Sequence, residues 1–319
     1  MPALDGVSVS LSTVADADGY NRSVAGIQIE AIRAGPGSGE NAVLAIQDDR
    51  FVSSSCRFGF PMFSRTTVGD DRMIVAHINS NSTVPRSRWC GIDLEPGAVL
   101  IYGPGVEHAA VNHPGLSFTF VTTTLKCLQA QAEQLRSSID LPERGRVRAL
   151  RPRAGTRAVG DAFTAMTGAA AAGAVPSGRL RDEVLRSIIE TLSVDATVML
   201  HGNAASTINR RRIVHACIDY AEAIGRIPSV TELCVVAHVS ERTLRRAFID
   251  AFDLPPSQFL LARALGQANR RLRNADENET VTDVALGLGF SHLGRFAGSY
   301  KHLFGERPSM TLRSSPARD

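Results

Sequence analysis

The sequence predicts a two-domain protein, in which a β-rich N-terminal domain and a few helices precede an all-helical C-terminal domain. Short apolar runs separated by Gly, Pro, Asn and Ser fill residues 1–125, as in a barrel or sandwich of short strands. Beyond residue 124, apolar residues recur at the spacing of helices. Near the C-terminus, one segment recurs in similar form 51 residues further along the chain.

The composition is that of a folded protein in a reducing compartment. With 319 residues, 44% of them hydrophobic and 21% charged, the chain can bury two cores. No apolar run approaches the ~20 residues of a membrane span, and no basic stretch with an apolar core opens the chain. We therefore expect a cytoplasmic protein with no membrane partner. The five cysteines include no C-x-x-C pair, so we expect reduced thiols and no zinc site.

Individual elements can be assigned ahead of the repeat. Three apolar runs predict strands, namely Met73–Ile78, Val99–Tyr102 and Phe118–Val121. Apolar residues at helical spacing predict helices over Leu125–Ser138 and Arg179–Val194, with a flexible stretch over 169–176 between them. The polar stretch 201–209 predicts a linker, so the expected domains are 1–200 and 210–314.

The first copy of the repeated segment has the pattern of a helix-turn-helix, expected over about 230–252. It reads T-E-L-C-V-V-A-H-V-S-E-R-T-L-R-R-A-F from Thr231 to Phe248. Such a motif needs a first helix with an apolar inner face, a tight turn, and a second helix held across the first. Leu233 and Cys234 supply the inner face, and Ser240 is placed to cap the second helix.

The second copy is expected over about 281–304 and reads V-T-D-V-A-L-G-L-G-F-S-H-L-G-R-F from Val281 to Phe296. Val284 takes the inner-face position, and Gly289 takes the turn position that needs a left-handed backbone. A helix over 259–273 would join the two units. Its length suits two recognition helices in successive turns of the major groove, about 34 Å apart.

These residues resemble the C-terminal domain of AraC-type (AraC/XylS) transcription regulators. The similarity runs from Arg210 to Arg313 and includes both motifs, the joining helix and the ending G-F…F…Y-K-x-x-F-G-x-x-P. Two positions depart from the family pattern. His238 replaces the usual turn glycine of the first unit, and Asp253 replaces the glycine before Pro256. Both residue types tolerate the left-handed region, so we expect the two turns to form.

A helical wheel of the first unit identifies the residues expected to meet DNA. With Phe248 at the centre of the buried side and 100° per residue, Arg242, Arg246 and Ile249 fall on the outer face. Arg245 lies nearer the edge of that face. The family resemblance places DNA contacts at the same three arginines. Arginine can pair bidentately with a guanine edge or hold a phosphate.

The second unit presents a different surface to the duplex. Its outward residues are small or apolar, namely Leu293, Gly294, Ala297 and Gly298. Because none of them can read a base through a side-chain hydrogen bond, we expect close approach with backbone and shape contacts. His292, Arg295 and Lys301 would hold phosphates or form intramolecular pairs. For Arg295, a structural salt bridge is the alternative.

The N-terminal domain contains G-A-V-L-I-Y-G-P-G-V-E-H-A-A-V-N from Gly97 to Asn112, which resembles the second motif of cupin barrels. In metal-binding cupins the position of His108 is a ligand, and a His-x-His and a Glu on an earlier strand complete the site. The chain has no H-x-H; His77 is isolated and His113 lies too far along. We therefore expect a cupin-like barrel without a metal and assign no cofactor.

The same barrel is the sensor half of AraC-type regulators, whose pattern the L-E-P-G…Y-G-P-G-x-E-H segment resembles. The resemblance implies a small effector in the barrel and a nearby helix that pairs two subunits. The candidate effector contacts, each of which could equally be core or surface, are Arg57, Trp89, Tyr102 and His108. The candidate pairing stripe, for which packing on its own barrel is the alternative, is Leu180, Val184, Leu185, Ile188 and Leu192.

The predicted function is an effector-responsive regulator that binds double-stranded operator DNA. RNA polymerase, a small effector and a second copy of the chain are its other expected partners, and the resemblance adds activation of a catabolic operon. Two alternatives stay open. A metal-dependent cupin enzyme fused to a DNA-binding domain would contain bound metal, and an effector-independent DNA-binding protein would keep its operator affinity whatever ligand is added. No G-x-S-x-G signature occurs, so we assign no catalytic residue.

Overall fold

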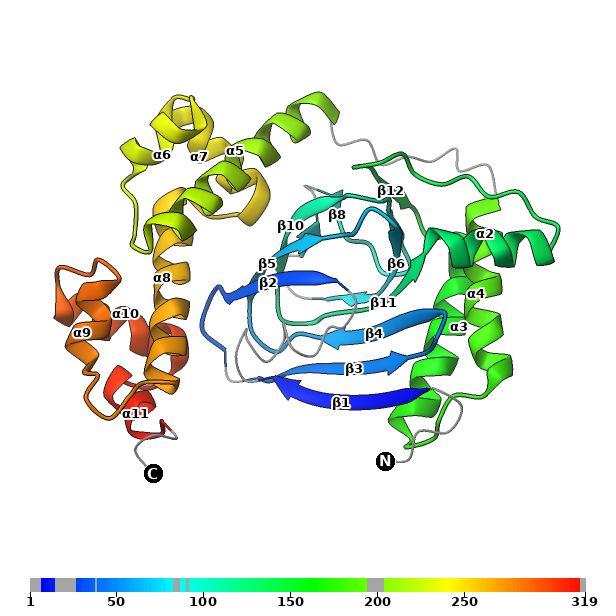
Figure 1. The fold of residues 1–319 in the computed structure, drawn as a ribbon, viewed down its shortest axis with the longest axis horizontal. Coiled ribbons are helices and arrows are strands. Elements are labelled where there is room, and N and C mark those ends of the chain that lie inside the picture. The colour runs from blue at the N-terminus through cyan, green and yellow to red at the C-terminus, as the bar shows by residue number, and fades with distance from the viewer. Residues whose placement is uncertain are drawn as a thin grey trace.

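In the part of the chain that the structure describes, two β-sheets and three covering helices form the N-terminal domain, and seven further helices form the C-terminal domain (Figure 1). The computed structural model describes residues 7–14, 27–37, 39–82, 87–89, 92–193 and 204–315. The strands are β1 Ser8–Val14, β2 Gln28–Arg33, β3 Asn41–Gln47, β4 Phe51–Arg57, β5 Met62–Thr67, β6 Arg72–Asn81, β7 Arg88–Trp89, β8 Ile92–Asp93, β9 Val99–Tyr102, β10 Glu107–Asn112, β11 Leu116–Thr124 and β12 Val147–Leu150. The helices are α2 Leu125–Gln134, α3 Ala154–Ala171, α4 Gly178–Ser193, α5 Ala204–Ile224, α6 Val230–Ala237, α7 Glu241–Phe252, α8 Pro256–Arg273, α9 Val281–Gly287, α10 Leu293–Phe304 and α11 Pro308–Arg313.

The two sheets face each other across an apolar core. One has the order β1-β3-β4-β11-β6-β9-β12 and the other the order β2-β5-β10-β7-β8, with antiparallel neighbours. Both sheets contribute to the buried cluster between them, which includes Met62, Ile78, Tyr102 and Phe118. The β-rich domain is confirmed, and β6, β9 and β11 contain the three predicted strands. In the described residues the strands form two facing sheets and not a closed barrel.

Helices α2, α3 and α4 cover the outer face of the seven-stranded sheet (Figure 1). Helix α3 was not predicted, because its sequence contains three glycines and an alanine run, and the stretch predicted to be flexible begins inside it. The close packing of α3 on β6 explains the glycine at position 160. A Cβ at this position would lie 2.5 Å from His77 Nε2, so only glycine lets α3 approach β6 this closely.

The segment predicted to be a linker is mostly helical. Helix α5 already begins at Ala204, so most of the segment 201–209 that we expected to be a linker is the first part of a helix. Residues 201–203 lie outside the described part of the chain. Ser, Thr and Asn in this stretch favour loops, but burial of Ile213, Val214 and Cys217 further along α5 offsets that preference.

Pairs of helices form where the repeat predicts the two units, as α6–α7 and α9–α10. Ser240 caps α7 by accepting a hydrogen bond from the backbone N–H of Thr243. The turn residues adopt left-handed backbones as expected, with φ of 52° at His238, 54° at Asp253 and 87° at Gly289. The joining helix α8 begins three residues before the predicted start, at Pro256, whose fixed φ suits the first turn of a helix.

The left-handed turn at His238 generates a prediction. A non-glycine residue there costs roughly 1–2 kcal/mol, and glycine costs about 0.5–1 kcal/mol in backbone entropy. We expect His238→Gly to raise the free energy of unfolding by about 0.5–1 kcal/mol and His238→Val to lower it, in urea unfolding followed by circular dichroism. The control is His302→Gly, the same change inside helix α10, which should destabilise by about 1 kcal/mol. Equal effects at the two positions would contradict the assignment.

Candidate DNA-binding surface and effector pocket

Helix α7 presents an arginine-rich outer face. Leu244, Ala247 and Phe248 are buried on its inner side, as the helical wheel predicts. Arg242, Arg245 and Arg246 are exposed on the other side. Their side chains form no ion pair or hydrogen bond within the described part of the chain, so they are available to an external anion.

Helix α10 presents a small and apolar outer face. Phe296, Tyr300 and Leu303 are buried, whereas Leu293 is 40% exposed. A Cβ at Gly294 or Gly298 would meet no atom within 4 Å, so contacts within the protein do not require glycine at either position. Each glycine costs the helix about 1 kcal/mol relative to alanine. Neither packing nor helix propensity therefore accounts for two glycines on this face.

Basic side chains flank that face. Arg295 and Lys301 are exposed, and neither forms an ion pair within the residues that the structure describes. The structural salt bridge that was the alternative for Arg295 is therefore not formed there. His292, at the N-cap of α10, is exposed and makes no side-chain capping bond.

One helix joins the two units through both of their cores. Phe259, Leu260 and Ala262 of α8 belong to the core of the first unit, and Leu265 and Leu272 belong to the core of the second. At 1.5 Å per residue the 18-residue helix is about 27 Å long. Because α8 is buried in both cores, it fixes how the recognition helices lie relative to each other.

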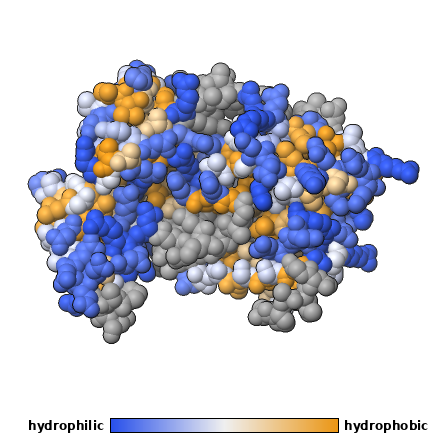
Figure 2. Space-filling view, viewed as in Figure 1, coloured by the Kyte–Doolittle hydropathy of each residue, from blue (hydrophilic) through white to orange (hydrophobic). Residues whose placement is uncertain are grey.

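The two units also carry exposed apolar residues at equivalent positions. Val235 of α6 and Leu286 of α9 stand 51 positions apart and are 68% and 56% exposed. Hydrophobic surface over α6 and α7 is visible at the upper left of Figure 2. The first helix of each unit thus carries one exposed apolar side chain at the equivalent position.

Three of the four candidate effector contacts line one pocket between the sheets. The Tyr102 and His108 rings stack with centroids 4.8 Å apart, and Trp89 meets Phe118 edge to face at 4.6 Å. The Trp89 Nε1–H donates to Asn112 Oδ1 at 2.8 Å. The pocket has a volume of about 40 Å³, room for two or three water molecules. A larger ligand enters only if these side chains move apart.

Arg57 does not line this pocket. Cys56, which precedes Arg57 in β4, and Phe58, which follows the strand, are both buried in the core between the sheets. Arg57 itself is exposed at the end of the strand. Successive side chains of a strand point to opposite faces, so Arg57 is directed away from the space between the sheets. The conformation described therefore does not bring Arg57 together with the other three candidates.

The stripe proposed for subunit pairing is buried within the chain. Val184, Leu185, Ile188 and Leu192 are at most 1% exposed and pack with the outer face of the seven-stranded sheet. This is the alternative that the sequence left open. The stripe therefore offers no apolar surface to a second subunit in this conformation, and only Leu180 at its edge is partly exposed.

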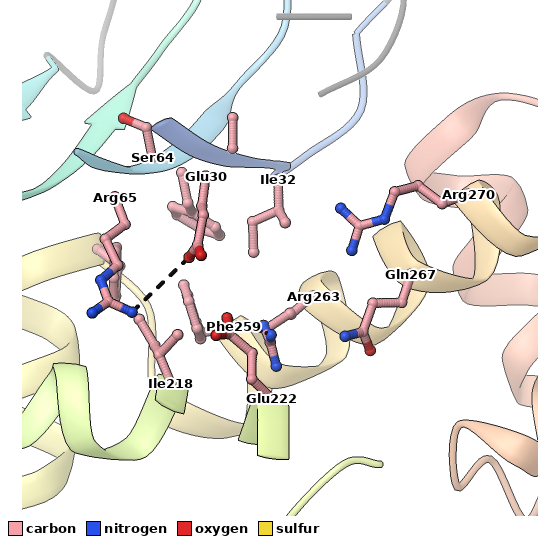
Figure 3. A pocket seen from close by; sticks show the side chains of 13 residues that line it. Glu30, Ile32, Ser64, Arg65, Ile218, Glu222, Phe259, Arg263, Gln267 and Arg270 are labelled. Carbon is pink, nitrogen blue, oxygen red and sulfur yellow. Dashed lines mark hydrogen bonds and ion pairs between the residues drawn. The ribbon is translucent and has the colours of Figure 1, made fainter. Parts of the chain in front are cut away.

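A second pocket lies where the N-terminal domain meets the C-terminal helices, and sequence reasoning missed it (Figure 3). It has a volume of about 300 Å³ between β2 and β5 on one side and α5 and α8 on the other. Arg65 pairs with Asp219 at 2.7 Å, and Arg263 pairs with Glu222 at 2.7 Å. Burial raises the pKa of Glu30, and the nearby Glu222 carboxylate raises it further.

An aromatic contact and a histidine complete this seam between the domains. Phe63 of β5 lies 5.3 Å from the rings of both Phe252 and Phe259, measured between centroids. His215 Nδ1 of α5 lies 2.5 Å from a Glu107 carboxylate oxygen of β10. Burial lowers the pKa of His215 below 6.5, Arg65 lowers it further, and Glu107 opposes both effects. The strand sequence M-F-S-R-T-T does not alternate between apolar and polar residues, so it gave no clear sign of such an outer face.

The described residues contain neither a candidate metal site nor a candidate membrane-spanning helix. No group of three or more His, Cys, Asp or Glu residues there lies close enough to hold a metal ion. No helix there has both the length and the apolar character that crossing a membrane requires.

Known proteins are similar to this chain in its C-terminal domain. A family model described as a helix-turn-helix domain matches residues 233–314. The probable thc operon regulatory protein of Rhodococcus erythropolis is 38% identical over 108 residues, which are 33% of this chain and 32% of that protein. The XylDLEGF operon transcriptional activator of Pseudomonas putida is 37% identical over 93 residues, which are 29% of each. The chain thus spans about a third of the length of the curated relatives it matches.

A solved structure is also similar to part of the chain. It is a probable AraC family transcriptional regulator from Rhodopseudomonas palustris, 35% identical, with 33% of this chain and 98% of that one covered and a TM-score of 0.30. The helix pairs α6–α7 and α9–α10 and the joining helix α8 make up most of the region that the helix-turn-helix family model matches. In its C-terminal part the chain is thus similar to operon regulators and to a probable AraC family transcriptional regulator.

The lowered pKa of His215 predicts a pH dependence of stability. Because the folded protein binds this proton less readily than the unfolded chain, the contribution is fully present above about pH 6.5 and is lost as the pH falls below it. We expect the melting temperature to fall less between about pH 7.5 and pH 5.5 in His215→Gln than in the wild type. His302→Gln, on the exposed side of α10, is the control. An equal fall in all three proteins would contradict a role for His215.

Proposed function

We propose that the chain is a sequence-specific transcription regulator that binds operator DNA through both helix-turn-helix units and responds to a small effector. The observation that carries this proposal is the pair of exposed recognition helices joined by α8, one rich in arginine and the other in glycine. Relatives matching this domain are described as operon regulators and activators. That description supports activation of a catabolic operon, with RNA polymerase as a partner and no enzymatic activity.

The two units divide the work of binding. Arg242 and Arg246 of the first unit read base edges, with Arg245 at a base or a phosphate, because an unpaired guanidinium can donate two hydrogen bonds to guanine. The second unit lies close to the duplex through Leu293, Gly294 and Gly298 and makes backbone and shape contacts. Arg295 and Lys301 hold phosphates beside it.

The effector site is the pocket between the two sheets, in a domain with the layout of a cupin-like sensor. Trp89, Tyr102 and His108 supply ring faces and polar atoms on its wall. Typical ligand pockets measure about 300–1,000 Å³, so binding opens this pocket well beyond its 40 Å³. A thermal-shift screen of small metabolites identifies the effector, because a ligand that binds only the folded state raises the melting temperature. A homodimer would need a surface other than the buried stripe of α4.

Base reading by the first unit predicts a change in sequence preference. Arg242→Ala and Arg246→Ala should each lose about 1–3 kcal/mol of discrimination at one base pair, measured by selecting sites from a random duplex pool. Arg144→Ala, which removes an exposed arginine paired with Asp70 in the N-terminal domain, should select the wild-type sites. If the Arg242 and Arg246 variants also select those sites with equal stringency, the arginines hold phosphate and do not read bases.

Close approach by the second unit predicts that bulk at its glycines interferes with binding. Gly298→Arg should weaken operator affinity about tenfold or more, or about 1.4 kcal/mol, although it adds a positive charge. The matched control is Gly168→Arg in α3, where a Cβ also meets no atom within 4 Å. Mobility-shift titrations measure both variants. Wild-type affinity in Gly298→Arg would show that α10 does not approach the duplex through this face.

A further inference from the structure

The five-stranded sheet is a single layer between the effector pocket and the first helix-turn-helix unit. In β5, Thr66 lines the pocket between the sheets, Phe63 and Arg65 line the seam with the C-terminal helices, and Ser64 borders both pockets. Successive side chains of a strand point to opposite faces, so adjacent residues serve opposite sides. A displacement of this strand toward one side is therefore transmitted directly to the other.

The neighbouring strands repeat this arrangement. In β10, His108 and Ala110 face the pocket, and Glu107 and Val111 face the helices. In β7 the two residues are Trp89, on the pocket wall, and Arg88, whose Nη1 lies 3.4 Å from Asp253 Oδ1. The register pairs Ala110 with Trp89 and Val111 with Arg88. Three strands thus connect the pocket with the seam through adjacent residues.

Hydrogen bonds tie these strands together on the pocket side. The Trp89 Nε1–H donates to Asn112 Oδ1 at 2.8 Å, and Asn112 Nδ2–H donates to Ser64 Oγ at 3.1 Å. All three side chains are buried. A ligand that moves Trp89 must therefore also disturb β10 and β5, and cannot move one strand alone.

On the seam side the contacts reach the C-terminal end of the recognition helix α7. Phe252 is the last residue of α7 and Asp253 is its left-handed cap. Phe63 touches the first, and Arg88 pairs with the second. The sheet therefore holds the helix that carries the three exposed arginines at the end opposite its N-cap.

The second unit has fewer contacts with the five-stranded sheet than the first unit has. Among the described residues, its core, formed by α8 to α11, contains no residue of the sheet, whereas the core of the first unit includes Phe63, Ala109 and Val111. Arg33 does approach the second unit, with its guanidinium 5.8 Å from the centroid of the Phe304 ring. Movement of the sheet would thus act chiefly on the first unit.

We propose that the five-stranded sheet couples occupancy of the pocket to the position of α7, through Phe63 and the Arg88–Asp253 ion pair. This inference rests on the proposed function, since it assumes that α7 meets DNA. Coupling between two sites is reciprocal, so DNA bound at α7 must alter the pocket as much as a ligand alters DNA binding. The effector need not be known, because duplex DNA can serve as the probe.

The chain contains one tryptophan, Trp89, which reports on the pocket wall by its fluorescence. It is 5% exposed between the sheets, so DNA cannot quench it by direct contact. Titration with an unlabelled duplex recovered by site selection should change the Trp89 emission, with a midpoint equal to the dissociation constant from a mobility shift. The change should shrink in Arg88→Gln, in Asp253→Gly and in Phe63→Leu, all of which should still bind DNA.

Asp253→Gly removes the carboxylate but keeps the left-handed backbone, so α7 should retain its end. In a double-mutant cycle, Arg88→Gln and Asp253→Gly together should reduce the response no further than either alone. Arg144→Ala, which breaks an exposed ion pair outside the seam, should respond like the wild type. DNA binding without any emission change, or a full change in the seam variants, would overturn the coupling. Failure of the wild type to shift any duplex would instead overturn the proposed function.

Discussion

The contact of Phe63 with Phe252 and Phe259 fixes how the two domains lie against each other. All three rings are at most 3% exposed, and the two helical rings stack 4.3 Å apart with Phe63 against both. An aromatic side chain buries roughly 150–250 Å², so this contact contributes substantially to the hydrophobic stabilisation of the seam. The surrounding ion pairs are partly exposed and contribute about 0–1 kcal/mol each. They therefore fix the direction and register of docking, whereas the rings supply its affinity.

Features that depend on a few neighbouring residues were predictable from the sequence. The caps and turns of both helix-turn-helix units follow from short-range backbone and side-chain chemistry, so Ser240, His238 and Gly289 could be placed by motif register alone. Helix α3 could not be predicted, because its glycines oppose a helix unless the close approach to His77 is known. The seam was also beyond prediction. It depends on which sheet face meets which helix, and residues 63 and 252 are brought together only by the whole fold.

The effector pocket shows the same limit at the level of single side chains. Trp89, Tyr102 and His108 come from three strands and line one pocket, whereas the sequence left open whether each of them was a contact, core or surface. The position of Arg57 away from this pocket has a simple cause. In F-V-S-S-S-C-R the central serines hide the alternation of apolar and polar residues, so the sequence does not tell which face of β4 is inward. A shift of one residue in register reverses the answer.

The two units contribute differently to DNA binding, so it matters which of them the sheet contacts. On our proposal, the unit held by the sheet is also the one whose arginines read bases, while the independent second core positions glycines against the duplex. A phosphate contact adds to affinity on every sequence, whereas a base contact adds only on the correct one. A sensor acting on the second unit would therefore change binding to all DNA by a similar factor. A sensor acting on α7 instead changes the difference in binding free energy between the operator and other DNA. That difference determines how often one site is occupied among many competing ones.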